Sequence, residues 1–141
     1  MPSQPPKWIK PQLTRLADEA PAGSDWLHET KYDGYRMHAR IDGATIQLLT
    51  RTGLDWSHRY KRTIEALRSL RVKSAYIDGE LCALNADGLP VFSRLQAAMD
   101  EGHTDQLVFF ALDLLYLNGE STAQLPLIKR KERLERLFKY D

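Results

Sequence analysis

One lysine in the first third of the chain has the neighbours that a nucleophilic amine needs. Lys31 is followed by Asp33 and Gly34 in the run Lys-Tyr-Asp-Gly-Tyr-Arg. An amine attacks only when neutral, and the ordinary lysine pKa is about 10.4, so nearby cations or desolvation must lower it. Glycine allows the backbone to approach a ligand closely. A charged strand end before a turn would give the same residues, and this motif alone does not separate the two explanations.

A second candidate is the arginine of Thr-Arg-Thr-Gly at residues 50–53. The strand that ends here is expected to pair with the strand that follows Lys31, so Arg51 and Lys31 can border one pocket. The planar guanidinium offers several donors and suits a phosphate or a ribose. A solvated arginine at a strand end is the commoner alternative.

Two carboxylates interrupt the otherwise apolar segment 74–84, in the sequence Asp78-Gly79-Glu80. Unpaired buried charge is costly, so these side chains need partners. Strand alternation puts Asp78 and Glu80 on the same face, where they could hold a sugar hydroxyl or Mg²⁺. The alternative is a salt bridge to Arg36 or Arg51.

A single charge also stands in the apolar run 108–117, where Asp113 is surrounded by aliphatic and aromatic residues. Charged residues are almost never fully buried without a partner. We therefore expect Asp113 to be paired or to face a ligand, while the rest of the run forms a core strand.

The composition fits one soluble domain and excludes several classes of protein. The chain has 141 residues, and its 20 lysines and arginines nearly balance 19 aspartates and glutamates, which leaves a formal charge of +1. A general nucleic-acid coating protein would carry a clear basic excess. Cys82 is the single cysteine, which excludes an internal disulfide and a cysteine-based zinc cluster. Neither a secretory signal nor a membrane span is recognisable, so we expect a cytoplasmic protein with no membrane partner.

Periodicity and turn residues predict an α+β fold with a mainly antiparallel sheet and flanking helices. Residues 1–24 carry five of the seven prolines and are expected to form an extended lead-in, separate from a domain over 25–141. Asp42-Gly43 predicts a hairpin. Alternation puts Tyr35, Met37, Ala39 and Ile41 on one strand face. The helix expected at 57–70 has an apolar stripe along one side, formed by Tyr60, Ile64, Leu67 and Leu70. Strands are expected at 26–29, 35–41, 45–50, 74–84, 89–92 and 106–117, and helices at 57–70, at 93–99 with Ser93 as cap, and at 127–138.

Four motifs in this order resemble the nucleotidyltransferase motifs of ATP-dependent DNA ligases. The lysine run resembles motif I, and Asp78-Gly79-Glu80 resembles motif III. Arg51-Thr52-Gly53 resembles the arginine-bearing motif between them, and residues 110–119 resemble motif IIIa. Pro11-Gln12-Leu13 and residues 26–29 resemble bacterial ligases, including the end-joining ligase D type. The resemblance implies a partial ATP-grasp-like DNA ligase/mRNA capping nucleotidyltransferase domain that uses ATP and Mg²⁺, in a bacterial protein acting on nicked or broken double-stranded DNA.

The resemblance also implies roles for the residues around the lysine. Lys31 would attack the α-phosphorus of ATP, form a lysyl-AMP phosphoramidate and release pyrophosphate. Asp33 would support the lysine or the DNA 3′ end. Glu29 and Thr30 would border the adenine, where a backbone carbonyl and amide can read its edge.

The remaining motifs would supply the ribose, phosphate and metal contacts. Arg36 and Arg51 would approach ribose, phosphate or the nick. Glu80 would hold the ribose or the metal, with Asp78 as a second metal ligand. In the complete family, AMP passes to a 5′-phosphate and a 3′-hydroxyl then seals the break, helped by Mg²⁺.

Two departures from the family pattern affect these expectations. Family members have an aromatic residue stacked on the adenine directly before the motif IIIa aspartate, whereas Leu112 stands here. Phe110 is expected to point the same way and is the other candidate for contact with adenine. The lysine-bearing motifs IV and V and the trailing OB domain are absent, so we expect a monomeric N-terminal fragment with little ligation and weak self-adenylation at best.

Two other functions remain possible at this stage. RNA ligases and mRNA-capping guanylyltransferases share Lys-x-Asp-Gly. A non-catalytic nucleotide- or DNA-binding module could instead use the basic residues of the final helix to contact a phosphate backbone. These residues are Lys129, Arg130, Lys131 and Arg133.

Overall fold

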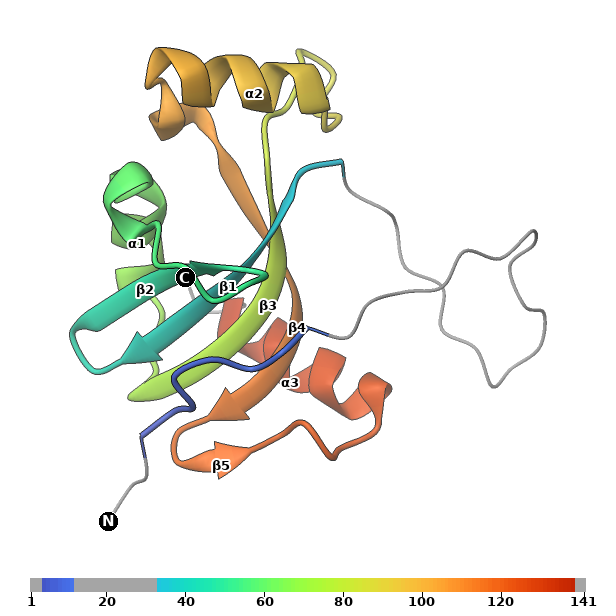
Figure 1. Cartoon of the computed structure of the whole chain (residues 1–141). Coiled ribbons are helices and arrows are strands. Elements are labelled where there is room, and N and C mark those ends of the chain that lie inside the picture. The colour runs from blue at the N-terminus through green and yellow to red at the C-terminus, as the bar shows by residue number, and fades with distance from the viewer. Residues whose placement is uncertain (1–3, 12–32, 139–141) are drawn as a thin grey trace, which may run out of the picture.

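The computed structural model describes residues 4–11 and 33–138, and it contains one antiparallel sheet (Figure 1). The strand order is β2-β1-β3-β4-β5, and every neighbouring pair is antiparallel. The strands are β1 (Tyr35–Asp42), β2 (Thr45–Thr50), β3 (Ser74–Cys82), β4 (Val108–Leu117) and β5 (Glu120–Ser121). The predicted α+β class and the hairpin at residues 42–45 are confirmed.

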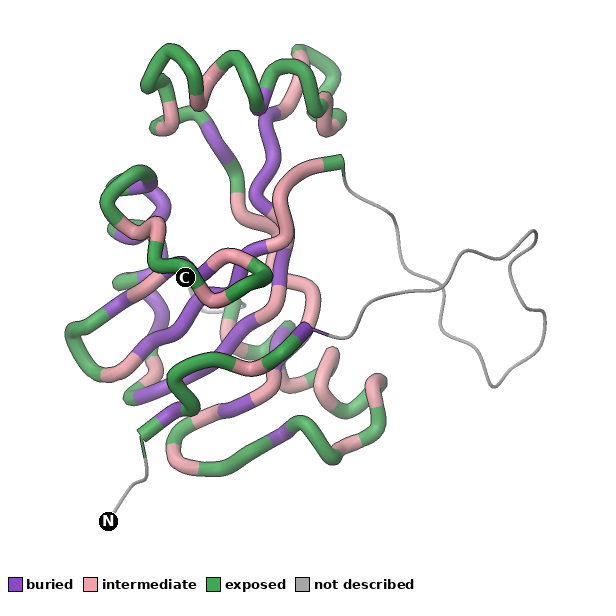
Figure 2. Tube along the Cα trace, in the orientation of Figure 1, coloured by how far each residue is buried: buried purple, intermediate pink, exposed green. Residues whose placement is uncertain are grey.

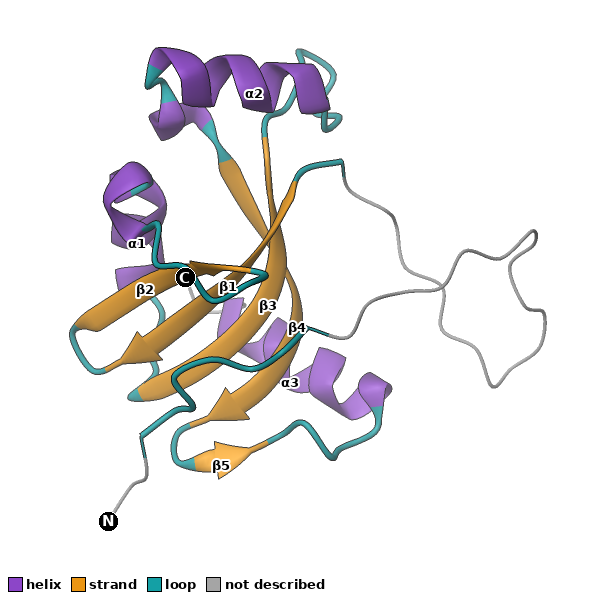
Figure 3. Cartoon of the chain, in the orientation of Figure 1, coloured by secondary structure: helices purple, strands orange, loops and turns teal. Residues whose placement is uncertain are grey.

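Helices flank this sheet, as Figure 3 shows. In the described part of the chain they are α1 (Lys61–Arg68), α2 (Phe92–Glu101) and α3 (Leu127–Phe138), with 3-10 turns at Ser57–Arg59 and Thr104–Gln106. The helix α2 lies beyond the end of the sheet where β3 leaves and β4 begins. Among the helices of residues 4–11 and 33–138, none combines the length and the apolar character that crossing a bilayer requires.

The main core lies on one face of the sheet. Met37, Ala39 and Ile41 of β1 are all buried there, and Tyr35 packs at its edge, so the predicted alternation is confirmed. The helices α1 and α3 pack against this face. The apolar stripe expected along the first helix is also confirmed, since four of its residues are buried in this core: Tyr60, Ile64, Leu67 and Leu70.

The opposite face is polar, and the N-terminal segment 4–11 covers part of it. This segment has no helix or strand and crosses the sheet on the viewer's side in Figure 1. Arg40 of β1 donates from its guanidinium to the carbonyls of Pro5 and Pro6, each at 2.9 Å. Ile9 packs against buried side chains of β2, β3 and β4, namely Leu49, Tyr76 and Tyr116. Figure 2 shows the buried positions that run through the centre of the sheet beneath this segment.

Several predicted boundaries were wrong where tertiary contacts decide them. The helix expected from residue 57 begins at Lys61, after a 3-10 turn, because Tyr60 is fully buried with a non-helical backbone. Ser93 lies inside α2, whose N-cap is the extended Val91. The strand expected at 89–92 is reduced to one bridge between Leu84 and Pro90. The strand expected at 26–29 lies outside the described residues.

Two irregularities interrupt the pairing of β4 with β3. Asp78 pairs with Asp113 and Gly79 with Ala111, so Leu112 is an extra residue on β4. Leu115 is extra in the same way further along the strand. Such bulges bend a strand and break its strict alternation of side chains. The direction of the motif IIIa side chains therefore does not follow from their spacing.

Gly34 marks a close approach between β1 and β3. A Cβ atom at this position would lie 2.2 Å from the carbonyl oxygen of Leu81 and 2.7 Å from Sγ of Cys82. Both distances are well inside van der Waals contact, and one of the atoms belongs to the backbone. The glycine of Lys-x-Asp-Gly thus has a structural reason within the sheet, in addition to any approach to a ligand.

We predict that Gly34→Ala destabilises the fold, because the added methyl must push β1 away from β3. Overpacking of this kind costs about 1–3 kcal/mol. Thermal unfolding followed by circular dichroism should show a fall in Tm of several degrees. Gly43→Asn is the matched control, since its φ of +61° suits asparagine and nothing lies within 4 Å of its Cβ position. Equal Tm values for the two variants would contradict the prediction.

Candidate active site

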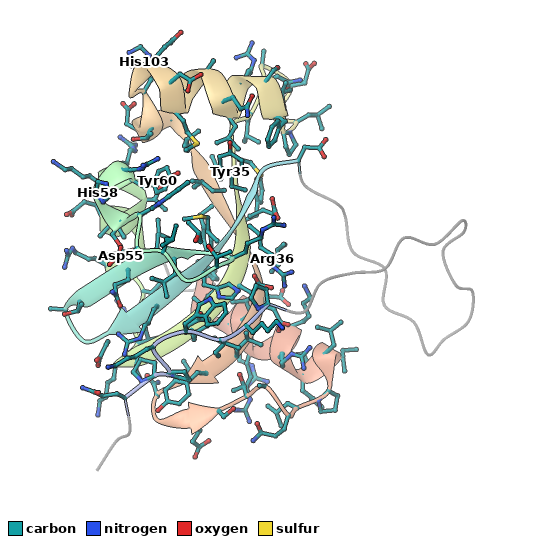
Figure 4. The ribbon with its side chains drawn as sticks, viewed as in Figure 1. Tyr35, Arg36, Asp55, His58, Tyr60 and His103 are labelled. Atoms are coloured by element: carbon teal, nitrogen blue, oxygen red, sulfur yellow. The ribbon has the colours of Figure 1, made fainter. Side chains whose placement is uncertain are left out.

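Three of the sequence motifs meet at one pocket of about 540 Å³. Arg36 comes from β1, Arg51 from the turn after β2, and Glu80 from β3. Figure 4 shows Tyr35 and Arg36 at the start of β1, below α2. The residues that line the pocket are Gly34, Tyr35, Arg36, Thr50, Arg51, Thr52, Leu54, Trp56, Glu80 and Phe92.

The strand register explains why these motifs converge. Arg36 lies directly across from Glu80, and Glu80 lies directly across from Phe110. Directly opposed residues in antiparallel strands share a face, so these three side chains form one row across the sheet. Met37 pairs with Thr50, which leaves Arg51 at the next position beside Arg36. The row combines positive and negative groups with an aromatic ring.

Asp78 is paired with Arg36, which is the salt bridge considered as an alternative from the sequence. Nε of Arg36 donates to Oδ1 of Asp78 at 3.1 Å and Nη2 donates to Oδ2 at 2.7 Å. The side chains of Arg36 and Asp78 are 27% and 14% exposed, so the pair is partly shielded from water. Two parallel hydrogen bonds fix the plane of the guanidinium.

The protonation of this pair follows from its surroundings. Burial alone would raise the pKa of Asp78, but the nearby His38 ring and the hydrogen bonds from Arg36 outweigh it, and the net pKa is lowered. The hydrogen bond to Asp78 in turn raises the pKa of Arg36 against the opposing effect of burial. The pair therefore remains ionic near neutral pH.

Behind this ion pair lies a buried chain of polar groups that sequence reasoning missed. Nε2 of His38 is 3.1 Å from Oδ1 of Asp78, and Nδ1 of His38 is 2.7 Å from the hydroxyl of Tyr76. The backbone N–H of Ile9 donates to the same hydroxyl at 2.9 Å. Burial raises the pKa of Tyr76 to about 12, so this hydroxyl keeps its proton. The available signal was the position of His38, two residues after Arg36 on the same strand face.

Arg51 stands on a short turn that its neighbours stabilise. Thr50 donates its N–H to the Leu54 carbonyl at 2.8 Å, and the N–H of Leu54 donates to Oγ1 of Thr50 at 3.1 Å. Gly53 adopts a φ of +89°, which other residues rarely do. The turn presents Arg51 as an exposed side chain at the pocket.

Aromatic residues form another part of the pocket wall, and sequence reasoning did not identify them. Tyr35, Trp56 and Phe92 come from β1, the segment before the first 3-10 turn, and α2. The rings of Tyr35 and Phe92 meet edge to face with centroids 5.5 Å apart. No local pattern indicated this grouping, because it depends on where α2 packs.

Asp113 is paired, as expected, but its partner lies on the final helix. Nε of Arg130 donates to Oδ1 of Asp113 at 2.8 Å. Burial raises the pKa of Asp113 by more than this hydrogen bond lowers it. Lys131 donates to the carbonyl of Leu112, and Lys129 lies 3.6 Å from Glu132. Contacts within the fold thus engage Lys129, Arg130 and Lys131, three of the four basic residues considered for a DNA-binding face.

The remaining predicted residues fall in three groups. Lys31, Glu29 and Thr30 lie outside the described residues. Asp33 is described and exposed just before β1. Phe110 and Leu112 are half-buried on β4, and neither lines the pocket, although Phe110 adjoins Glu80 in the register.

The residues present give limited support for a metal ion. Within the described ranges, no group of three or more histidine, cysteine, aspartate or glutamate side chains is gathered for metal binding. Asp78 is engaged by Arg36 and His38, so its role as a metal ligand remains a prediction that this arrangement does not favour. Glu80 at the pocket suits the common Mg²⁺ arrangement, in which one or two carboxylates act together with substrate phosphates.

Comparison with known proteins gives the context for this geometry. The family model for the ATP dependent DNA ligase domain matches residues 10–141. The multifunctional non-homologous end joining protein LigD of Pseudomonas aeruginosa is 39% identical over 133 residues. That alignment covers 94% of this chain and 16% of the relative, so the chain spans about a sixth of the length of this relative.

Solved structures agree with the sequence comparisons. The ligase domain of LigD from M. tuberculosis matches with a TM-score of 0.68 and 32% identity, over 77% of this chain and 36% of that one. A mycobacterial DNA ligase D complexed with ATP and MES matches with a TM-score of 0.65 and 31% identity, over 77% and 35% of the two chains. These similarities favour the DNA ligases over RNA ligases, capping enzymes and non-catalytic modules. The chain belongs to the ATP dependent DNA ligase domain family.

Proposed function

We propose that this chain is the nucleotide-accepting part of an ATP-dependent DNA ligase, with Lys31 as the residue that takes AMP. The observation that carries the proposal is the meeting of Arg36, Arg51 and Glu80 at one pocket whose lining includes Gly34. Lys31 stands three residues before Gly34 in the sequence, and three residues of chain span at most about 11 Å. The ATP-bound ligase D relative supports ATP as the nucleotide.

The first reaction transfers AMP to the lysine. The neutral amine of Lys31 attacks the α-phosphorus, the bond to the bridging oxygen of the β-phosphate breaks, and pyrophosphate leaves. The amine loses a proton as the phosphoramidate forms. Arg36 and Arg51 would offset the negative charge of the phosphates, and the same positive charges would favour the neutral form of the amine.

The other groups would orient the nucleotide. Glu80 would accept a hydrogen bond from a ribose hydroxyl or hold Mg²⁺ together with phosphate oxygens. A bound Mg²⁺ would neutralise phosphate charge as the transfer proceeds. Phe110 and Leu112 are the proposed adenine contacts on β4, with Glu29 and Thr30 at the base edge. Asp33 would support the lysine or the DNA 3′ end.

In the whole protein, AMP would then pass to a 5′-phosphate of nicked or broken double-stranded DNA, and a 3′-hydroxyl would close the break. Residues 25–141 would form the N-terminal part of the adenylation domain after the lead-in of residues 1–24. We place this protein in the bacterial cytoplasm, where chromosomal DNA is accessible. Its similarity to the end-joining protein LigD of P. aeruginosa supports a role in DNA repair.

We predict that this chain forms a lysyl-AMP adduct weakly and that Lys31→Ala abolishes it, because no other amine is proposed at the α-phosphorus. The measurement is transfer of radioactivity from α-labelled ATP to protein in the presence of Mg²⁺, followed by acid release of the label. Lys129→Ala is the matched control, since that exposed lysine lies on α3 away from the pocket lining. Labelling that survives in Lys31→Ala would exclude this residue as the nucleophile.

We also predict that Arg51→Ala and Glu80→Gln each weaken ATP binding. Hydrogen bonds to charged groups contribute about 1.5–3 kcal/mol, so the Kd measured by calorimetry should rise by about 10- to 100-fold. Arg62→Ala removes an exposed arginine on α1 outside the pocket lining and should leave the Kd unchanged. If the Kd changes equally in all three variants, the pocket is not the nucleotide site.

A further inference from the structure

We propose that residues 4–11 act through Tyr76 and His38 as positioning residues for Arg36. In this arrangement a segment that never enters the pocket determines how one of the pocket's cations is held. The inference rests on the proposed function, because it takes Arg36 to face the nucleotide. It assigns a role to two buried side chains that the chemistry of AMP transfer does not use.

The first step is the contact between the segment and the sheet. The N–H of Ile9 donates to the hydroxyl of Tyr76 at 2.9 Å, and the Tyr76 side chain is fully buried. Because the oxygen accepts from Ile9, its own proton is available for another acceptor. Nδ1 of His38 lies 2.7 Å away and is the acceptor in position to receive it.

The second step follows from the two nitrogens of imidazole. When Nδ1 of His38 accepts from Tyr76, the neutral ring carries its proton on Nε2. Nε2 lies 3.1 Å from Oδ1 of Asp78, a close approach without the alignment of a hydrogen bond, so this edge of the ring borders the carboxylate. His38 is fully buried, so the contact is shielded from bulk solvent. Hydrogen bonds therefore connect Ile9, Tyr76 and His38, and the 3.1 Å approach of Nε2 extends this chain of contacts to Asp78.

The third step is the pair of hydrogen bonds between Asp78 and Arg36. Asp78 receives Nε and Nη2 of Arg36 on its two oxygens, while His38 approaches the same carboxylate from the interior. Rotation of this carboxylate about its bond to Cβ would break the two hydrogen bonds from Arg36 and move Oδ1 away from His38. The guanidinium plane of Arg36 is therefore fixed from behind, and the side chain still borders the pocket.

The same segment also contacts the turn that carries Arg51. The ring of Trp8 lies against Gly53, with ring carbons 3.4 Å from where a Cβ would stand. Gly53 belongs to the turn that presents Arg51. The segment itself is anchored by Arg40, which bonds the carbonyls of Pro5 and Pro6 and is itself nearly buried. Residues 4–11 therefore touch the supports of both arginines.

The test removes the hydroxyl of Tyr76 and keeps its ring. In Tyr76→Phe, the loss of the hydroxyl and its two hydrogen bonds, to Ile9 and His38, should raise the Kd for ATP about fivefold. Tyr60→Phe is the matched control. Tyr60 is also fully buried, but it belongs to the main core on the opposite face of the sheet, where its hydroxyl donates to Sδ of Met99 at 3.7 Å. The control should leave the Kd for ATP unchanged, and an equal rise in both variants would overturn the proposal.

A double-mutant cycle separates positioning from simple stability. If Tyr76 acts through Arg36, Tyr76→Phe should have no further effect on ATP binding in an Arg36→Ala background. A fivefold effect that persists there would overturn the proposal. Deletion of residues 1–9 removes the Ile9 donor by an independent route and should weaken ATP binding at least as much as Tyr76→Phe. Unchanged binding after this deletion would also overturn the proposal.

Nitrogen NMR of the His38 ring gives a readout that does not need ATP. We expect the proton on Nε2 and an unprotonated Nδ1, with the Nδ1 signal moving in Tyr76→Phe. A proton on Nδ1 would overturn the inferred direction of the chain. If the unsubstituted protein shows the expected ring but fails to bind ATP, the proposed function fails while the connection to Arg36 stands.

Discussion

The antiparallel register between β1 and β3 is the constraint on which the candidate site depends. It places Arg36 across from Glu80, and Glu80 in turn across from Phe110 on β4. A slip of one residue would move every side chain of a strand to the other face. The glycines of both motifs lie at close approaches between strands, since a Cβ on Gly34 would stand 2.2 Å from the Leu81 carbonyl oxygen of β3 and one on Gly79 would stand 2.3 Å from the Phe110 carbonyl oxygen of β4. The register and the motif glycines therefore support each other.

The two faces of the sheet have different roles, because one stabilises the fold and the other carries the candidate site. One face buries aliphatic residues against α1 and α3, and the other carries a row of charged and aromatic side chains. Burying charge is costly unless each group has a partner. On the polar face, Arg40 satisfies this condition through backbone carbonyls of residues 4–11, and Asp78 satisfies it through Arg36 and His38. The N-terminal segment is thus part of the electrostatic balance of the sheet as well as its cover.

Much of the fold was predictable because local periodicity determines it. The alternation in β1, the Asp-Gly hairpin and the apolar stripe of the first helix all follow from residues close together in sequence. The errors occur where distant residues decide. Buried Tyr60 delays the start of α1, and the packing of α2 places its cap at Val91 instead of the hydroxyl of Ser93. The bulge at Leu112 arises from pairing with β3 and leaves no mark in the spacing of apolar residues.

In the candidate site, too, local sequence predicts some features and distant residues decide the others. Asp78 and Glu80 illustrate why. Strand alternation correctly predicts that both carboxylates share a face, but it cannot say which partner each one meets. The register offsets Asp78 from Arg36 by two residues, a diagonal distance that a long arginine side chain spans, whereas Glu80 lies at the pocket. Asp78 therefore orients a cation while Glu80 faces the space that a ligand would fill. Two neighbouring carboxylates of one strand thus take different positions, because Nε and Nη2 of Arg36 bond Asp78 while Glu80 lines the pocket.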